Sequence, residues 1–299
     1  MPRFRAVVTD LDNTLYPWVD FIVPALESML DSLVATTGLP RVRIVQSLKA
    51  VYGTYESNEY PFAIQESEIF KPYEGDFDSF SALVLEPARQ AFKAARDRYL
   101  KPYLGVRETL DRLRERKVAV VGLTDAPRNA AELRLKHLKL DGHFDALYTL
   151  PSFPLPEKNL APEIRRREEA GHYRSRTRVV ELPREAEKPS PEGLRRILAD
   201  LGLPGREVLY VGDNVKKDMP VAQACGAVGV WAEYGTYVSR EYRDRLAVIS
   251  APRVTQRHVA DEGQKRWPLA ISSFTQVLDI LDGARWAPPR APAARRTRR

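Results

Sequence analysis

The chain has 299 residues, of which 43% are hydrophobic and 29% charged. These values lie close to the globular averages of roughly 45–50% and 25%, which excludes wholesale disorder and a membrane-embedded chain. The length exceeds the usual single-domain size of roughly 100–150 residues, so we expect two domains or one domain with large insertions.

The excess positive charge lies at the end of the chain. The 47 basic and 40 acidic residues give a net charge of +7, which taken alone favours an anionic partner such as nucleic acid. Residues 285–299, RWAPPRAPAARRTRR, contain six arginines and no acid, so residues 1–284 carry a net charge of only +1. We predict that 285–299 is a disordered basic tail, and that nucleic acid is a partner only if this tail binds it.

Cysteine content and hydropathy bear on the compartment. The single cysteine, Cys225, excludes an intramolecular disulfide and fits a reducing compartment. The N-terminal sequence lacks the apolar stretch of about 7–15 residues that marks a signal peptide. No run of about 18 apolar residues is present to form a transmembrane helix. We therefore expect a cytoplasmic protein with no membrane partner.

The first half of the chain predicts one strand followed by helices. Ala6–Asp10 is a β-branched apolar run that ends in a carboxylate, which is typical of a buried parallel strand whose carboxyl end carries the chemistry. Asp20–Thr37 and Phe77–Leu100 place apolar residues at helical spacing. We therefore predict that residues 16–103 form a separate, all-helical subdomain inserted after the first strand.

The second half alternates strands with helices. Four runs have the same apolar character as the first: Lys117–Thr124, Phe144–Leu150, Glu207–Gly212 and Ala227–Trp231. Helical patterns lie between them, at Gly105–Lys117 and Ser190–Gly205. This alternation predicts a parallel α/β sheet. A proline-rich, irregular insertion at 151–187 interrupts it, and its TRVVEL segment could add one strand.

Two acids separated by one residue follow the first strand, in the sequence DLDNTLY. A turn that begins after Asp10 can bring Asp10 and Asp12 to one crevice at the carboxyl edge of the sheet. One acid could then serve as a nucleophile and the other as an acid. The alternative is an ordinary turn at the end of a strand, because Asp and Asn favour turns.

Four motifs in chain order resemble those of the haloacid dehalogenase superfamily, in its phosphatase branch with a C1-type helical cap. The matching residues are Asp10 to Thr14 (D-x-D-x-T), Thr124 after an apolar run, Lys188 ahead of a helix, and Gly212-Asp213 with Asp218 five residues after Asp213. Four ordered matches are far more specific than any single one. The resemblance implies a Rossmann-like core at 1–15 and 104–284, with helices on both faces of the sheet, and a helical cap at 16–103.

The resemblance also implies a role for each matching residue. Asp10 would be the nucleophile that becomes an aspartyl-phosphate, and Asp12 would be the general acid and then the general base. Thr124 and the N–H of Asp125 would bind the phosphoryl oxygens. Lys188 would balance the negative charge of Asp10 and the phosphate. Lys158, inside the insertion, is the alternative to Lys188.

A Mg²⁺ ion belongs to the same resemblance. Its protein ligands would be the carboxylates of Asp10 and Asp213 and the backbone carbonyl of Asp12, an all-oxygen set that suits a hard ion. Asp218 and Asn214 would lie just outside the ligands. The metal is needed because a phosphate dianion repels an anionic nucleophile.

The function implied is that of a Mg²⁺-dependent phosphatase. Its partner would be a small phosphorylated metabolite, a nucleoside 5′-monophosphate or a sugar phosphate, because a helical cap over the site excludes larger substrates. Asp12 favours phosphoester hydrolysis, since a dehalogenase has no leaving alkoxide to protonate. A phosphomutase or a dehalogenase of the same superfamily remains an alternative, as does a nucleic-acid-associated protein that uses the basic tail.

Overall fold

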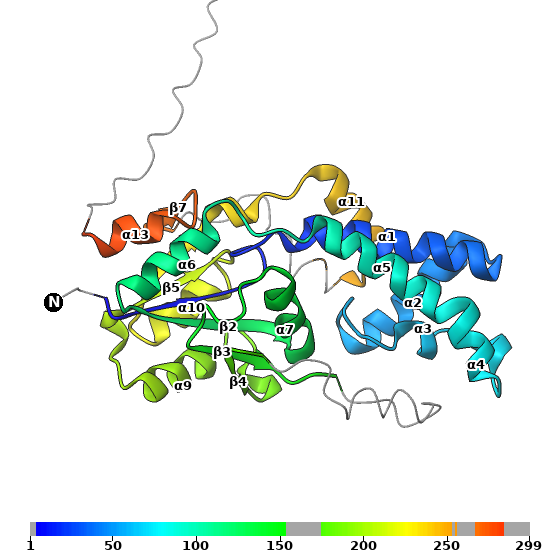
Figure 1. The fold of residues 1–299 in the computed structure, drawn as a ribbon, viewed down its shortest axis with the longest axis horizontal. Coiled ribbons are helices and arrows are strands. Elements are labelled where there is room, and N and C mark those ends of the chain that lie inside the picture. The colour runs from blue at the N-terminus through cyan, green and yellow to red at the C-terminus, as the bar shows by residue number, and fades with distance from the viewer. Residues whose placement is uncertain (1–3, 154–174, 253–254, 256–266, 284–299) are drawn as a thin grey trace, which may run out of the picture.

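The computed structural model describes residues 4–153, 175–252, 255 and 267–283 (Figure 1). Lys158 and most of the predicted insertion lie outside the described residues, and so does the basic tail at 285–299. The described part of the insertion contains strand β4, which covers four residues of the TRVVEL segment.

A seven-stranded sheet, in the order β4-β3-β2-β1-β5-β6-β7, forms the core of the larger unit. All neighbouring strands pair in parallel, which confirms the predicted parallel α/β sheet. The strands are β1 (Ala6–Thr9), β2 (Ala119–Pro127), β3 (Ala146–Leu150), β4 (Arg178–Glu181), β5 (Val208–Gly212), β6 (Val228–Ala232) and β7 (Ala270–Ile271). The strand order reverses around β1, so a crevice is expected at the carboxyl ends of β1, β2 and β5.

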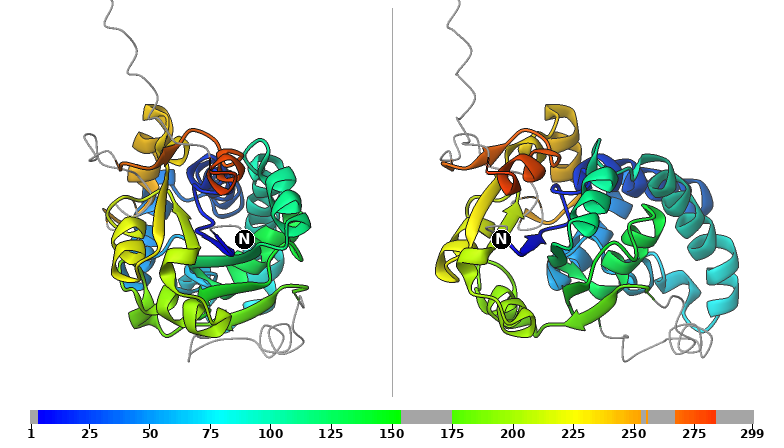
Figure 2. Two further views of the ribbon diagram at one scale, coloured as in Figure 1. Left: turned by 90° about the vertical axis from the view of Figure 1, so that its left-hand side faces the viewer. Right: turned by 60° about the vertical axis from the view of Figure 1, so that its left-hand side comes forward.

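Helices cover both faces of the sheet, as predicted (Figure 2). Alternation along β1 directs Val7 to one apolar cluster and Val8 to the other. The first cluster includes residues of α6 (Val106–Glu115), α7 (Arg128–His137) and α13 (Gln276–Leu281), and it continues into the helices between β1 and α6. The second cluster includes residues of α9 (Glu192–Leu201) and α10 (Asp218–Ala224). Burial on both faces explains why the central strands consist of unbroken apolar runs.

Only helices are described between β1 and α6, in agreement with the all-helical prediction for residues 16–103. They are α1 (Trp18–Thr37), α2 (Arg41–Tyr55), α3 (Ala63–Glu66), the short turn η1 (Lys71–Tyr73), α4 (Phe77–Phe80), the π-helical turn η2 (Ser81–Leu85) and α5 (Glu86–Tyr99). Helices α1 and α5 pack along each other and extend away from the sheet on the right of Figure 1. We refer to these helices and their loops as the cap.

Helix α11 (Arg240–Ile249) follows β6 but packs against cap helices α1 and α2. The Nε atom of Arg245 donates to Glu27 at 2.7 Å, and the ammonium group of Lys49 donates to the carbonyl of Ala247 at 3.1 Å. The side chain of Asn58 in the cap donates to the hydroxyl of Ser250. Helix α11 belongs to residues 104–284, which the sequence predicts to form the core, and it therefore connects this stretch to the cap.

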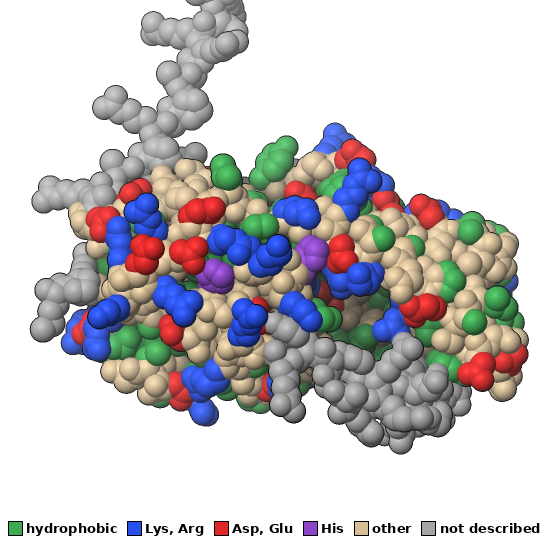
Figure 3. All heavy atoms as spheres, viewed as in Figure 1, with side chains coloured by type: hydrophobic (Ala, Val, Ile, Leu, Met, Phe, Trp, Pro, Cys, Tyr) green, Lys and Arg blue, Asp and Glu red, His purple; other side chains and the backbone are tan. Residues whose placement is uncertain are grey.

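Charge and hydropathy of the described surface agree with the composition. On the face shown in Figure 3, basic and acidic side chains are interspersed, as expected for residues that together carry little net charge. None of the helices in the described ranges is long and apolar enough to cross a membrane.

Candidate active site

A pocket opens at the crevice where the strand order reverses. The core lines it with residues that follow β1 and β5, with the last residues of β2, and with the segment around Lys188. The cap lines it with Trp18 and with residues 56–59, Glu-Ser-Asn-Glu, which we call the cap loop. All the predicted site residues lie among the residues that line this pocket: Asp10, Asp12, Thr124, Asp125, Lys188, Asp213, Asn214 and Asp218.

The loop after β1 turns sharply, and Asn13 makes the turn. Its φ of 56° lies in the left-handed region, which asparagine adopts more readily than most residues. Its amide N–H donates to the carbonyl of Tyr16 at 2.8 Å, and its side-chain oxygen accepts from the N–H of Trp18, the first residue of α1, at 2.9 Å. The turn brings Asp10 and Asp12 to the same pocket.

Asp10 is buried at the end of β1. One carboxylate oxygen accepts from the N–H of Leu11 at 2.7 Å, and the other lies 2.8 Å from the ammonium nitrogen of Lys188. Burial raises the pKa of Asp10 to about 7; Lys188 opposes this shift and Asp218 adds to it. A positive charge near Asp10 therefore favours its ionised, nucleophilic form.

Lys188 lies between two carboxylates. Its ammonium nitrogen is 2.8 Å from an oxygen of Asp10 and 2.8 Å from an oxygen of Asp218. Burial alone would lower the pKa of Lys188, but the two carboxylates outweigh it and raise the pKa well above its usual value. Asp218 also accepts from the hydroxyl of Tyr210 at 3.0 Å and from the N–H of Asn214 at 2.9 Å. This network fixes the lysine against Asp10.

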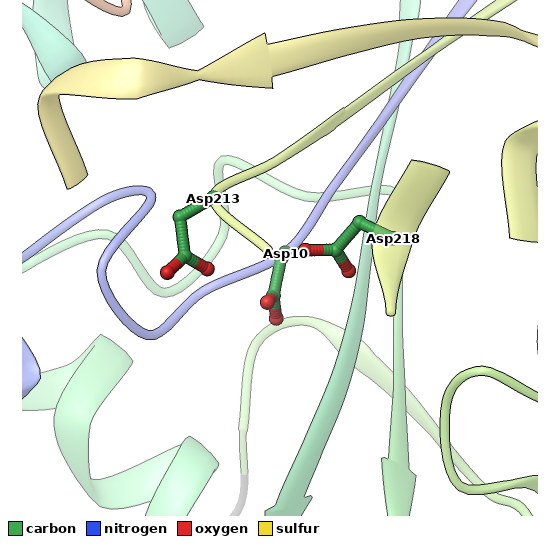
Figure 4. Close-up of side chains that lie close together, drawn as sticks. All are labelled: Asp10, Asp213 and Asp218. Carbon is green, nitrogen blue, oxygen red and sulfur yellow. The ribbon is translucent and has the colours of Figure 1, made fainter. Parts of the chain in front are cut away.

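Three carboxylates converge at one side of the pocket (Figure 4). One oxygen each from Asp10, Asp213 and Asp218 lies within 4.8 Å of the others. Burial raises the pKa of Asp213 well above its usual value, and Asp218 and Asp10 add to the shift. An all-oxygen set in which acids outnumber the single lysine fits a hard divalent cation.

The loop that carries Asp213 is bonded to its own backbone and to β6. The side-chain oxygen of Asn214 accepts from the N–H groups of Lys216 and Lys217, at 3.0 and 3.1 Å. The indole N–H of Trp231 donates to the carbonyl of Asp213 at 2.8 Å. These bonds fix the backbone that positions the Asp213 carboxylate.

Thr124 does not end its strand as the sequence predicts. Strand β2 continues to Pro127, and its pairing with β3 shifts register between Leu123 and Pro127. Such an irregularity changes the direction in which side chains point and is common next to active sites. The hydroxyl of Thr124 accepts from the N–H of Ala126 at 3.1 Å.

The side chain of Asp125 is held by two partners. It accepts from the N–H of Lys188 at 3.0 Å, and its second oxygen lies 3.2 Å from the ammonium nitrogen of Lys217. Its carboxylate is thereby drawn to these donors, while its backbone stays next to Thr124 in the wall of the pocket.

Sequence reasoning missed a buried arginine at the site. Arg134, on α7, is 3% exposed. One of its terminal nitrogens donates to Asp12 at 2.7 Å, and the other contacts the carboxylate of Glu59 in the cap loop. Arg134 shares a helix face with the apolar residues Ala131 and Leu135, and this position could have indicated that the arginine is buried. No sequence pattern indicated which residues it contacts.

Sequence reasoning also missed how the segment after β6 supports the site. The hydroxyl of Tyr234 donates to the carbonyl of Thr14 at 2.6 Å. A Cβ atom at Gly235 would lie 1.7 Å from the carbonyl oxygen of Asn13, so only glycine permits this approach. The segment therefore packs directly on the loop that holds Asp10 and Asp12.

Comparison with known proteins agrees with this geometry. Residues 4–226 match the family model of the haloacid dehalogenase-like hydrolases. The chain is 26% identical over 232 residues to a phosphoglycolate phosphatase of Pseudomonas savastanoi pv. phaseolicola, which is 77% of this chain and 70% of that protein. It is 25% identical over 233 residues to the phosphoglycolate phosphatase of Pseudomonas fluorescens, with the same coverage.

Two solved structures share the fold. A 2-haloacid dehalogenase from Pseudomonas syringae pv. tomato superposes with a TM-score of 0.53 at 17% identity, over 94% of this chain and 99% of that one. A phosphatase of the haloacid dehalogenase superfamily from Thermococcus onnurineus gives a TM-score of 0.53 at 20% identity, over 95% and 100%.

The sheet order, the carboxylates near the strand ends and the helical insertion after β1 define a Rossmann-like α/β protein with a helical cap and an acidic site. The chain belongs to the haloacid dehalogenase-like hydrolase family.

Proposed function

We propose that the protein is a phosphatase that hydrolyses a small phosphate monoester through an aspartyl-phosphate at Asp10. An oxygen of Asp10 attacks phosphorus, and the bond from phosphorus to the ester oxygen breaks. Asp12 gives a proton to the departing oxygen. Asp12 then accepts a proton from a water molecule as that water attacks phosphorus. The bond from phosphorus to Asp10 breaks, which releases inorganic phosphate and restores both acids.

The observation that carries this proposal is the arrangement of Asp10. It is buried, 2.8 Å from the ammonium group of Lys188, and it shares its pocket with a second acid, Asp12. Lys188 would attract the phosphate and offset its repulsion by the carboxylate. Thr124 and the N–H of Asp125 stand at the register shift of β2, where they would donate to the phosphoryl oxygens. The relatives named phosphoglycolate phosphatases support the same class of reaction.

Mg²⁺ is the cofactor that fits the carboxylate cluster. Asp10, Asp213 and the backbone carbonyl of Asp12 would hold it, and Asp218 would keep Lys188 in place beside it. The cation would neutralise charge on the phosphoryl oxygens and on the attacking carboxylate. The raised pKa values of Asp10 and Asp213 support this assignment, because a cation would offset the crowding of negative charge that contributes to them.

Metal dependence is the first expected result. Treatment with EDTA should abolish hydrolysis of p-nitrophenyl phosphate, and added Mg²⁺ should restore it. Because the ion binds only the folded state, saturating Mg²⁺ at about 100 times its Kd should stabilise the protein by about 2.7 kcal/mol. Thermal unfolding with and without Mg²⁺ measures this shift. Asp213→Asn should remove the shift, whereas Asp78→Asn, on the exposed side of α4, should keep it.

The substrate is proposed to be a nucleoside 5′-monophosphate or a sugar phosphate. Among the described residues of the pocket wall, the cations are Lys188 and Lys217, and each lies near two carboxylates. The cap loop adds Glu56 and Glu59 and the polar side chains of residues 57 and 58. These groups can hydrogen-bond to hydroxyl groups, and the two glutamates, of which Glu59 also contacts Arg134, oppose a second anion. The leaving group is therefore an alcohol with further hydroxyls rather than a hydroxy acid such as glycolate.

A matched pair of substrates tests this preference. Glycerol 3-phosphate has a hydroxymethyl group at the position where 3-phosphoglycerate has a carboxylate, and the two are otherwise the same. We expect kcat/KM to be at least about tenfold higher for glycerol 3-phosphate, because placing like charges together costs more than about 1.4 kcal/mol. Glu56→Gln should narrow the difference, and Glu74→Gln, on the exposed part of the cap, should not. Equal or reversed preference would show that the cap loop does not exclude anionic leaving groups.

A further inference from the structure

Arg134 is a buried charge that the proposed chemistry does not use. Its side chain is 3% exposed, and it stands behind Asp12 rather than among the residues described as lining the pocket. It therefore does not touch a substrate bound there. Arginine is almost never fully buried without a partner, because an uncompensated buried charge is costly. Its contacts therefore indicate its role.

The guanidinium joins three parts of the protein. One terminal nitrogen donates to Oδ1 of Asp12 at 2.7 Å, and the other contacts the carboxylate of Glu59 in the cap loop. The guanidinium carbon lies 6.0 Å from the ring centre of Tyr16 and 5.4 Å from that of Phe21, on the first cap helix. Contacts on several sides leave the group little freedom to turn.

We propose that Arg134 is a positioning residue, which orients the carboxyl group of Asp12 toward the leaving oxygen. Glu59 makes this orientation of Asp12 depend on the position of the cap loop. The inference rests on the proposed function, in which Asp12 protonates the departing oxygen. Arg134 binds Oδ1 of Asp12, so the proton would be transferred from Oδ2. Glu59 belongs to the cap loop, so the guanidinium is held by both Asp12 and Glu59 when that loop lies over the pocket.

The chemistry supplies a readout that a merely structural arginine would not change. A basic leaving oxygen needs a proton as its bond to phosphorus breaks, whereas a weakly basic one departs without it. Phenyl phosphate and 2,4-dinitrophenyl phosphate share a ring and a phosphate but differ in the basicity of the leaving phenolate. The ratio of their kcat/KM values therefore reports proton donation in the first step, in which the phosphoryl group moves to Asp10.

The experiment compares Arg134→Gln and Glu59→Gln with the wild type on both esters. For Arg134→Gln we expect kcat/KM to fall about 100-fold on phenyl phosphate, the lower range for general-acid catalysis, and less than about threefold on 2,4-dinitrophenyl phosphate. Glu59→Gln should also lower kcat/KM more on phenyl phosphate than on 2,4-dinitrophenyl phosphate, but by a smaller factor. Asp12→Asn should show the same difference between the two esters as Arg134→Gln. Adding Arg134→Gln to Asp12→Asn should lower kcat/KM little further. Arg195→Gln on α9 and Glu68→Gln in the cap, both exposed, are the matched controls.

Equal losses on the two esters would overturn the inference and leave the proposed function intact, provided that activity still requires Asp10. Activity that survives Asp10→Asn would overturn the proposed function itself. If Arg134→Gln fails to fold, Glu59→Gln decides alone, because it keeps the arginine and its bond to Asp12. A loss on phenyl phosphate that exceeds the loss on the dinitro ester then supports the inference, and equal effects contradict it.

Discussion

Replacing Asp10 with asparagine is expected to lower kcat for p-nitrophenyl phosphate by roughly four to six orders of magnitude, the range measured when single catalytic residues are removed from a hydrolase. Asparagine has the same shape but is a far weaker nucleophile. It can still accept from the N–H of Leu11, so the turn after β1 should be kept. The measurement is initial-rate hydrolysis at saturating Mg²⁺, with the fold checked by circular dichroism.

The control for this prediction is Asp78→Asn, the same change on the exposed side of a cap helix, which should leave kcat unchanged. Residual activity of Asp10→Asn that grows over days would point to deamidation back to aspartate, and mass spectrometry of the variant detects that. A folded Asp10→Asn protein that retains more than a few per cent of wild-type activity would show that another group attacks phosphorus.

Replacing Lys188 with methionine is expected to destabilise the protein by about 3–5 kcal/mol, the cost of breaking a buried ion pair by removing one partner. Methionine is about as long as lysine but has no charge. Its presence would leave Asp10 and Asp218 close together without the cation that lies 2.8 Å from each. Urea unfolding in EDTA measures the loss, because bound Mg²⁺ would mask it.

A surface control and a double mutant test this prediction. Lys71→Met removes an exposed lysine that pairs with Glu68 at a spacing of three residues, and such surface pairs contribute about 0–1 kcal/mol. Adding Asp218→Asn to Lys188→Met should recover part of the loss, because it removes one of the two facing charges. A loss below about 1 kcal/mol for Lys188→Met would show that Lys188 does not balance these carboxylates.

The sequence was informative wherever a functional residue lies at or near the carboxyl end of a strand. Asp10 and Asp213, which follow β1 and β5, and Thr124, near the end of β2, could be placed at one edge of the sheet, because parallel strands align their carboxyl ends and buried strands have a clear apolar pattern. The short strand β4 was readable in the TRVVEL segment for the same reason. Strand β7 has only two residues, which is too short for any periodicity to mark it.

The parts that the sequence could not supply are contacts between distant segments. Arg134 bonds to a residue 122 positions away, and no pattern within its own helix indicates that partner. Glu59 lies in a loop without periodicity, so nothing indicated that it would face the pocket. The packing of α11 on the cap and the approach of Gly235 to Asn13 likewise depend on tertiary structure, which local patterns do not encode.

The central claim is that Asp10 carries the phosphoryl group during turnover. The direct test mixes the enzyme and Mg²⁺ with a large excess of p-nitrophenyl phosphate, quenches in acid within the first turnovers and reduces the protein with borohydride, which converts an acyl phosphate of aspartate to homoserine. Peptide mass spectrometry should then find homoserine at position 10 and aspartate at position 12. Aspartate at position 10 in a sample that shows a burst of p-nitrophenol, or homoserine at another position, would contradict the account.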